Sequence, residues 1–308
     1  MNYFSHNPLN RYSEIRADEA RIEQLWEDER AQVLVVSGNL SLLSADAQAA
    51  AILPGAEATQ LAQIAKVRVY LGSEGEVPYF ALGFEKEQEE LAALLPENHK
   101  LGDLRQVALQ LPKEQGALLA YARGLVHWNL HHTYCSNCGS LTESHEAGHS
   151  RHCTNSSCNR HHYPRTDTAI IVLISEGDAC LLGRQQVWPQ GMYAVIAGFL
   201  EPGETLEQAV VREAMEEVSV KLQRVTYHSS QPWPFPASIM VGFRAEAANR
   251  NVQVDNKELE AARWFTRKEI VAGLKEGSLS LPPQFSIAYR LVKDWFNETG
   301  EYKLEDLI

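Results

Sequence analysis

The sequence predicts an α/β protein whose C-terminal part is a mixed β-sheet sandwiched between helices. Short runs rich in β-branched and aromatic residues alternate with longer helical stretches, the pattern of strands connected by helices. A cysteine-rich stretch near the middle of the 308-residue chain is too short to hold a core without a metal. This length and an apolar content of 44% allow two or three folded domains.

Residues 1–131 form the first predicted domain. Three runs there are β-rich and lie beside turns that contain glycine: 32–38, 66–72 and 78–84. Residues 88–95 and 114–131 predict helices, and the second carries apolar residues all round, as a buried or connecting helix does. No nucleotide-binding fingerprint occurs in this domain, and its residues assign it no chemistry.

Residues 132–163 predict a small metal-binding module. Its four cysteines are Cys135, Cys138, Cys153 and Cys158, spaced as CxxC and CxxxxC. In a chain whose N-terminus lacks an apolar signal core, this spacing indicates structural zinc rather than disulfides. Eight of the eleven histidines lie between His127 and His162, so a mixed Cys/His site is the alternative. The fifth cysteine, Cys180, lies in an apolar run and predicts a buried thiol.

Residues 164–308 form the third predicted domain. Residues 163–185 predict two strands around a Glu-Gly-Asp turn. Four more strands are expected along this segment, at 193–196, 220–227, 239–245 and 263–266. An amphipathic helix is expected after Pro282. No internal repeat is visible anywhere in the chain.

The segment between Gly198 and Val220 carries the clearest chemistry. Thr205 and Gln208 form a capping box, so a helix is expected to begin at Thr205. Three glutamates at i, i+3 and i+4 gather on one side of it: Glu213, Glu216 and Glu217. Four apolar residues are expected to pack against a core from the opposite side: Val211, Ala214, Met215 and Val218. The acidic side is either a solvated surface or a site for a hard divalent cation.

The net charge and the targeting signals limit the binding partners and the cell compartment that are expected for this protein. A net charge of −12 argues against nonspecific binding of nucleic acid or membrane surfaces by the whole chain. The longest apolar runs are far shorter than a membrane span, and no targeting motif is present at either end. A cytoplasmic protein is therefore expected.

The order of residues in the acidic segment resembles the Nudix box. Gly198 is followed by Glu204, then by Arg212 with Glu213, and then by Glu216 with Glu217. The resemblance implies a hydrolase for nucleoside diphosphates linked to another moiety, with Mg²⁺ or Mn²⁺ bound by the box glutamates. Ser219 replaces the family's glycine. Glycine would suit a left-handed helix end, and serine there should cost on the order of 1 kcal/mol.

A second motif narrows the resemblance to one branch of the family. Residues 230–238 read SQPWPFPAS, in which prolines interleaved with aromatics give a stiff extended segment. By itself it could be a proline-rich loop anchored on the core. Beyond the box and after a four-cysteine module, it resembles the signature of the NADH pyrophosphatase branch. The resemblance implies a Nudix α/β/α sandwich, preceded by a zinc ribbon and by a degenerate Nudix-like domain in residues 1–131.

This resemblance implies cleavage of the diphosphate of NAD(H), which yields nicotinamide mononucleotide and AMP. A second reading is removal of NAD caps from RNA 5′ ends, because the same bond is cut. A third, from another class, is a catalytically inactive zinc-ribbon binding module. The resemblance also implies a homodimer.

The resemblance also implies which residues bind the metal and the substrate, each by its position in the motifs. Glu213 and Glu217 match metal ligands, and Glu216 beside them is the expected general base. The Ala197 carbonyl and Glu258 match further metal contacts, although Glu258 also fits a plain surface charge. Substrate contacts are expected from Tyr163, Phe199, Gln231, Pro232, Trp233, Pro234, Phe235, Pro236, Ala237, Ser238 and Ala288. Arg212 is expected to orient the glutamates by ion pairing.

Overall fold

The protein consists of two compact units that exchange short segments. The structure is a computed structural model and describes residues 1–85, 89–254 and 257–307. The N-terminal unit comprises Phe4–Thr166 and Trp233–Ala237. The C-terminal unit comprises Met1–Tyr3, Asp167–Pro232 and Ser238–Ile308. The domain boundaries expected at 131/132 and 163/164 stay a prediction. The two compact units divide the chain at 166/167 and include the exchanged segments 1–3 and 233–237.

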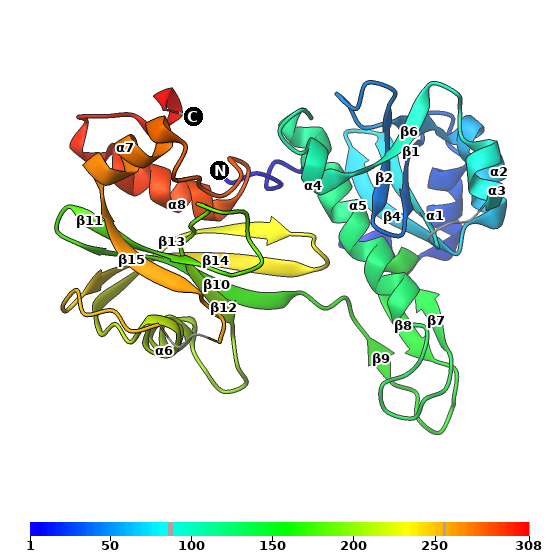
Figure 1. Ribbon diagram of the computed structural model, residues 1–308. Coiled ribbons are helices and arrows are strands. Elements are labelled where there is room, and N and C mark those ends of the chain that lie inside the picture. The colour runs from blue at the N-terminus through cyan, green and yellow to red at the C-terminus, as the bar shows by residue number, and fades with distance from the viewer. Residues whose placement is uncertain (86–88, 255–256, 308) are drawn as a thin grey trace. The chain divides into compact units, whose positions relative to one another are not determined.

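The C-terminal unit is a mixed six-stranded sheet with helices on both faces (Figure 1). Its strands are β10 Asp167–Glu176, β11 Ala179–Arg184, β12 Ile196–Phe199, β13 Leu222–Trp233, β14 Ser238–Ala247 and β15 Ala261–Thr266. Its helices are α6 Leu206–Val218, α7 Arg267–Glu276 and α8 Ile287–Phe296, followed by the short turns η3 Asn297–Thr299 and η4 Leu304–Asp306. Buried residues of α6 pack on one face of the sheet and those of α8 on the other.

The central strand β10 holds this sheet together. It pairs in parallel with β14 and antiparallel with β11 and β12. The strand expected at 193–196 begins only at Ile196, because residues 196–199 are the ones that pair with β10. The other predicted strands and the helix after Pro282 are confirmed, with shifted ends.

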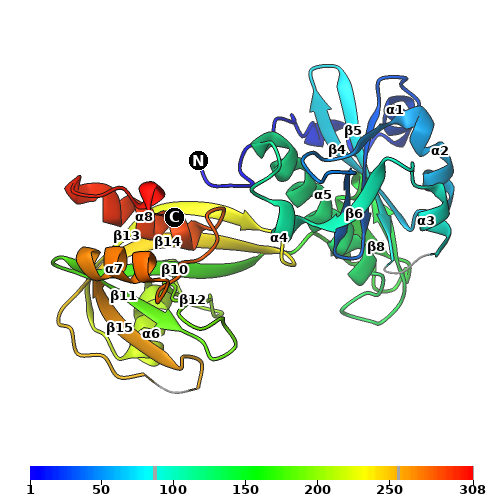
Figure 2. The ribbon, with the colours of Figure 1, turned by 45° about the horizontal axis from the view of Figure 1, so that its top comes forward.

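The N-terminal unit contains a second six-stranded sheet. Its strands are β1 Gln32–Ser37, β2 Leu40–Ser44, β3 Ile52–Pro54, β4 Val67–Glu74, β5 Val77–Phe84 and β6 His99–Asp103. Its helical elements are η1 Ser13–Ile15, α1 Glu19–Trp26, α2 Gly55–Ile64, α3 Glu89–Leu94, α4 Leu104–Val107 and α5 Lys113–His131 (Figure 2). Within the described residues, no helix is long and apolar enough to cross a membrane.

The two large sheets have the same topology. The N-terminal order is β4-β5-β1-β2-β6 with β3 added on β1, and the C-terminal order is β13-β14-β10-β11-β15 with β12 added on β10. In each sheet the first strand pairs in parallel with the fifth. Helix α2 follows β3 as α6 follows β12. The chain therefore contains a structural duplication, which confirms the degenerate copy of the domain that the resemblance implies for the N-terminal part.

A third, small sheet belongs to the cysteine-rich module. It is formed by β7 Thr142–His145, β8 Ser150–Cys153 and β9 His161–His162, with the turn η2 Glu146–Gly148 between the first two strands. Both strand pairings are antiparallel.

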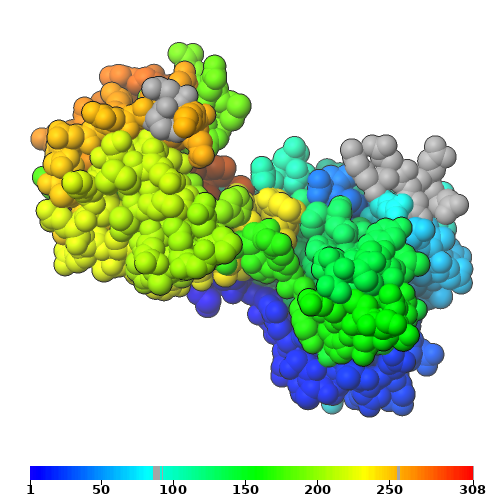
Figure 3. Space-filling view, turned by 90° about the horizontal axis from the view of Figure 1, so that it is seen from below, coloured from blue at the N-terminus to red at the C-terminus, as the bar shows by residue number. Residues whose placement is uncertain are grey.

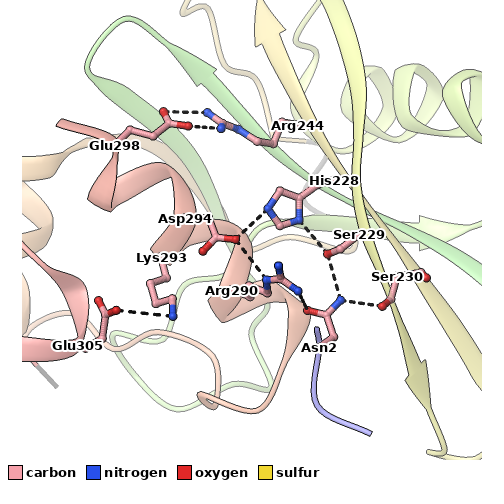
Figure 4. A network of polar contacts seen from close by, with 10 residues as sticks. All are labelled: Asn2, His228, Ser229, Ser230, Arg244, Arg290, Lys293, Asp294, Glu298 and Glu305. Atoms are coloured by element: carbon pink, nitrogen blue, oxygen red, sulfur yellow. Dashed lines mark hydrogen bonds and ion pairs between the residues drawn. The ribbon is translucent and has the colours of Figure 1, made fainter. Parts of the chain in front are cut away.

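Asn2 ties the start of the chain to the C-terminal unit (Figure 4). Its amide nitrogen donates to Ser229 Oγ at 3.0 Å, and its amide oxygen accepts from Arg290 Nη1 at 2.8 Å. His228 continues the network, bonded to Ser229 Oγ at 2.8 Å and to Asp294 Oδ2 at 3.0 Å. Because Asn2 is 5% exposed, these bonds satisfy polar groups that water does not reach.

The end of α6 confirms the conformational role predicted for residue 219. Ser219 is the C-cap and lies in the left-handed region at φ 58° and ψ 28°. A side chain there is strained, and glycine is not.

We expect Ser219→Gly to raise the unfolding free energy by about 1 kcal/mol, because it relieves this strain. Urea denaturation of both proteins measures the difference, with Ser219→Ala as the control that keeps a Cβ and should show no gain. A lower stability of the glycine variant would contradict the assignment.

Candidate functional site

Helix α6 begins where the sequence predicts. The Thr205 hydroxyl accepts a hydrogen bond from the Gln208 backbone at 3.2 Å, and the Gln208 side chain accepts one from the Thr205 backbone at 2.8 Å. This reciprocal capping box satisfies two backbone donors at the helix start and sets the register of every residue that follows.

Two of the three glutamates of α6 face the protein, whereas Glu216 faces solvent. Glu213 is 7% and Glu217 is 5% exposed, in one stripe with four buried apolar residues: Ala209, Val210, Ala214 and Val218. Val211 and Met215, expected to pack on a core, are 45% and 40% exposed, so that expectation was wrong. Both lie on the exposed side of α6. The yellow-green part of the chain that contains this helix is on the face seen in Figure 3. A purely solvated acidic surface is therefore excluded for Glu213 and Glu217.

Gly198 explains how a carboxylate fits beneath the helix. A Cβ atom added at residue 198 would lie 1.8 Å from Oε1 of Glu213, well inside van der Waals contact. Glycine at this position leaves room for the Glu213 carboxylate over β12. With any other residue, the carboxylate would have to move from the place that the structure gives it.

Arg212 organises the carboxylates around it. Its Nε and Nη2 atoms donate to the two carboxylate oxygens of Glu204 at 2.7 and 3.0 Å. Nη1 donates to Glu213 Oε1 at 2.8 Å and to Glu216 Oε2 at 3.1 Å. Nη2 also donates to the Phe199 carbonyl at 2.9 Å. The predicted ion pairing is confirmed, and it joins the glycine loop to the helix.

Burial and ion pairing shift the pKa values of two glutamates, Glu213 and Glu204, in opposite directions. Burial raises the pKa of Glu213 above its usual range, against the hydrogen bond from Arg212, and the charges of Glu216 and Glu258 raise it further. The hydrogen bonds from Arg212 lower the pKa of Glu204. Glu204 is thus the firmly ionised partner of Arg212, and Glu213 is a carboxylate whose charge is not fully compensated.

Glu258 lies close enough to Glu213 to act on its pKa, although the two residues are far apart in sequence. The residues after it are held firmly. Leu259 is 4% exposed, and Glu260 both pairs with Arg184 Nε at 2.8 Å and donates its backbone N–H to the Arg184 carbonyl at 2.8 Å. Arg184 ends β11 and carries no motif, so sequence reasoning missed this clamp.

The donors around Glu213 suit a hard divalent cation. The carboxylates of Glu213, Glu216, Glu217 and Glu258 offer oxygen atoms, as the backbone carbonyl of exposed Ala197 also does. Among the residues that the structure describes, the cysteines are the group whose ligand atoms all lie within 4.8 Å of one another. The glutamates are less tightly gathered, because Arg212 draws Glu213 and Glu216 toward itself.

The N-terminal sheet has no counterpart to this acidic stripe. Helix α2 occupies the equivalent place, yet it carries one acidic residue, Glu57, and its buried residues are Ala58 and Leu61. The carboxylate chemistry described here therefore belongs to the C-terminal copy of the fold.

Two of the predicted substrate contacts lie in the interior. Gln231 is fully buried, and its amide nitrogen donates to the carbonyls of Phe285 at 2.7 Å and Tyr3 at 3.2 Å. Its amide oxygen accepts from the Ile287 backbone at 2.7 Å. Ala288 is 8% exposed in the core beneath α8. In this structure the Gln231 amide fixes the start of α8.

The remaining predicted contacts are distributed over both units. Trp233 ends β13 and Ser238 begins β14, so residues 234–237 form a turn rather than a continuous extended segment. Tyr163 in the N-terminal unit and Phe199 in the C-terminal unit are each 62% exposed. Both rings are available to stack on a ligand.

The four cysteines form a compact group that could bind zinc. The Sγ atoms of Cys135 and Cys158 are 3.8 Å apart, and those of Cys138 and Cys153 are 3.4 Å apart. Gly139 turns the chain after the first pair with a φ of 74°. Among the described residues the four-cysteine set, rather than a mixed Cys/His set, brings its ligand atoms together.

Comparisons with known proteins agree with this architecture. A NUDIX domain model matches residues 164–285, an NADH pyrophosphatase-like rudimentary NUDIX domain model matches 30–128, and an NADH pyrophosphatase zinc ribbon model matches 130–163.

Similar proteins carry related names. NAD-capped RNA hydrolase NUDT12 of Macaca fascicularis is 40% identical over 72% of this chain and 51% of its own length. NAD(P)H pyrophosphatase NUDT13, mitochondrial, of Mus musculus is 37% identical over 72% of this chain and 69% of its own length. NAD-capped RNA hydrolase NudC of Pseudomonas aeruginosa is 38% identical over 61% and 64%. The chain spans about half the length of the NUDT12 proteins that it matches.

Proposed function

This chain belongs to the Nudix hydrolase family, in the branch with a rudimentary Nudix domain and a zinc ribbon, and on that premise we propose that it hydrolyses the diphosphate of NAD(H). The products would be nicotinamide mononucleotide and AMP. The observation that carries the proposal is the pair of buried carboxylates, Glu213 and Glu217. Of these, Glu213 lies over Gly198 and pairs with Arg212.

The residues of the box have separate tasks in this proposal. Glu213, Glu217, Glu258 and the Ala197 carbonyl would hold Mg²⁺ or Mn²⁺, which supplies charge neutralisation and a water of lowered pKa when bound. Arg212 keeps Glu213 in place from the side of the glycine loop. Glu216 is 61% exposed and is our choice of general base, because it is the member of the set that solvent reaches most easily.

We infer that the substrate rings are recognised by stacking. Phe199 leaves the end of β12 with an exposed ring and a carbonyl held by Arg212, so its position is tied to that of the metal ligands. Tyr163 and residues 232–238 complete the proposed substrate-binding set. Gln231 and Ala288 would act from the interior by shaping the segment that carries the contacts.

A second candidate substrate is the NAD cap of an RNA 5′ end. It is favoured by relatives named NAD-capped RNA hydrolases, and it requires cleavage of the same diphosphate bond. Turnover of NADH and of an NAD-capped oligonucleotide, compared side by side, distinguishes the two. Comparable kcat/KM values would mean that one site serves both.

Product analysis tests the proposed reaction. Purified protein is incubated with NADH and Mn²⁺, and AMP and nicotinamide mononucleotide are quantified for the wild type and for Glu217→Gln. We expect stoichiometric formation of both products by the wild type and a severe loss in the variant. No AMP from the wild type would support the third reading, an inactive zinc-ribbon binding module.

We also propose that the ribbon binds one structural zinc per chain and that the protein is a homodimer. Metal analysis of the purified protein and light scattering in solution measure these two quantities.

A further inference from the structure

The tip of the signature segment, residues 233–237, is part of the N-terminal unit. It contains Pro234 and Pro236, which have no backbone N–H to donate. Within the tip one backbone bond is present, from the Phe235 N–H to the Trp233 carbonyl at 2.8 Å. A segment with so few internal bonds depends on its surroundings for a defined conformation.

Arg123 supplies the main polar contact to this tip. It lies on α5 and is 5% exposed, an uncommon place for a guanidinium group. Its Nε donates to the Pro234 carbonyl at 2.7 Å. The other side of the group donates to Asn39, to the backbone carbonyl and, at 3.1 Å, to the side-chain oxygen. One side chain therefore joins α5, the β1–β2 turn and the tip.

Phe235 adds a second set of contacts. Its ring lies 4.6 Å from the Arg105 guanidinium carbon and 5.3 Å from that of Arg123, within the range of cation–π attraction. The rings of Phe4 and Trp233 approach it edge-on, with centroid distances of 6.1 and 5.1 Å. The tip is thus held by the hydrogen bond from the Arg123 side chain to the Pro234 carbonyl, and by the cation–π and aromatic contacts of Phe235.

The burial of an arginine at position 123 needs a physical reason. Burying a guanidinium is unfavourable unless its donors are satisfied, and burial lowers the pKa of Arg123. The acceptors of its hydrogen bonds are neutral oxygen atoms of Pro234 and Asn39. The charge of Asp103 offsets only part of the effect of burial on the pKa of Arg123. An apolar residue could fill the same volume on α5, but it could not bind the carbonyl of the tip.

We propose that Arg123 is a positioning residue for the substrate-binding segment, and that holding residues 233–237 is the task of the N-terminal unit. The inference rests on the proposed function, because that function assigns Trp233 and Phe235 to the substrate. It gives a role to a domain that lacks the carboxylates of its C-terminal counterpart.

The test compares Arg123→Met, Arg123→Lys and a matched control in the full-length protein. Arg151 is a suitable control, since it lies in the same unit, is 8% exposed and donates to Thr142 and Asn129, which are outside the tip. Hydrogen exchange, measured by mass spectrometry, follows the tip amides without any substrate. Steady-state kinetics with NADH and Mn²⁺ then follow KM and kcat separately.

In Arg123→Met we expect the tip amides to exchange about tenfold faster or more, because a charged hydrogen bond to Pro234 is lost. KM for NADH should rise by about tenfold, while kcat changes by less than about threefold, since the box carboxylates are untouched. Arg123→Lys should recover part of both effects, because an ammonium can still donate to the Pro234 carbonyl. Arg151→Met should leave the tip exchange within about twofold of the wild type.

The proposal would be overturned if the tip amides of a folded Arg123→Met protein exchanged hydrogen at the wild-type rate. It would also be overturned if KM for NADH rose as much in Arg151→Met as in Arg123→Met. If Arg123→Met does not fold, Arg123→Lys alone must show faster tip exchange and a raised KM. A wild-type protein that does not hydrolyse NADH would refute the proposed function, whereas the exchange result would still decide whether Arg123 holds the tip.

Discussion

Replacing Glu213 by glutamine is expected to lower kcat/KM for NADH by about 10³-fold, because a buried oxygen of the proposed metal site loses its charge. Glutamine keeps the shape of the side chain over Gly198 and can still accept a hydrogen bond from Arg212. The loss should therefore come from metal binding and charge rather than from misfolding. Mn²⁺ titration and steady-state kinetics measure the two contributions.

Glu207→Gln is the matched control for this experiment. Glu207 lies in the first turn of the same helix, but its side chain is exposed and outside the buried stripe. It should retain wild-type kinetics. An equal loss in both variants would mean that the charge of the helix as a whole, and not the buried carboxylate, supports activity.

Glu213→Gln should also change how the stability of the protein depends on pH. Burial raises the pKa of Glu213, so its contribution to stability is present below the unfolded-state pKa and is lost as the pH rises through the folded-state pKa. At neutral pH, Glu213→Gln should therefore make the metal-free protein more stable than the wild type. Metal binding needs the ionised carboxylate, so the Mn²⁺ affinity of the wild type should weaken as the pH falls toward the raised pKa.

The second large effect is a loss of stability, which is expected when zinc is removed from the ribbon. The three short strands of the ribbon contain ten residues in total, too few to bury a core of their own. Cys135→Ser, or a strong chelator, should therefore unfold residues 132–163 and lower the stability of the N-terminal unit by several kcal/mol, in keeping with structural zinc sites. Zinc analysis and hydrogen exchange across the ribbon measure the outcome.

Cys180→Ala serves as the control, because Cys180 is fully buried in the core of the C-terminal unit and is not a member of the metal group. It should keep the zinc content of the wild type. Full zinc occupancy in Cys135→Ser would argue against the four-cysteine site.

Several features could be predicted from the sequence because they depend on residues a few positions apart. The capping box at Thr205 needs only Gln208, three residues on, and the left-handed cap at Ser219 needs only the end of the helix. The cysteine spacing likewise reports a local ligand geometry. The helix caps lie within one turn and each cysteine pair lies within one short loop, so the order of residues in the chain carries the information.

The orientation of the acidic helix is a different case. Hydrophobic periodicity placed Val211 and Met215 inside, whereas the structure places Glu213 and Glu217 there. Periodicity assumes that buried residues are apolar, and a functional site violates that assumption. The absence of a side chain at Gly198, fifteen positions before Glu213, makes the inward carboxylate possible.

The sequence by itself determined the chemistry of this protein: the carboxylates of the box, the four thiols and the signature segment are all defined by residue type and spacing. The tertiary structure alone decided the exchange of residues 1–3 and 233–237 between units, the inward orientation of Glu213 and Glu217, and the contact between Arg123 and Pro234. The reason is physical. Arg123 binds a backbone carbonyl 111 residues away, and since every residue has such a carbonyl, no residue type marks the partner.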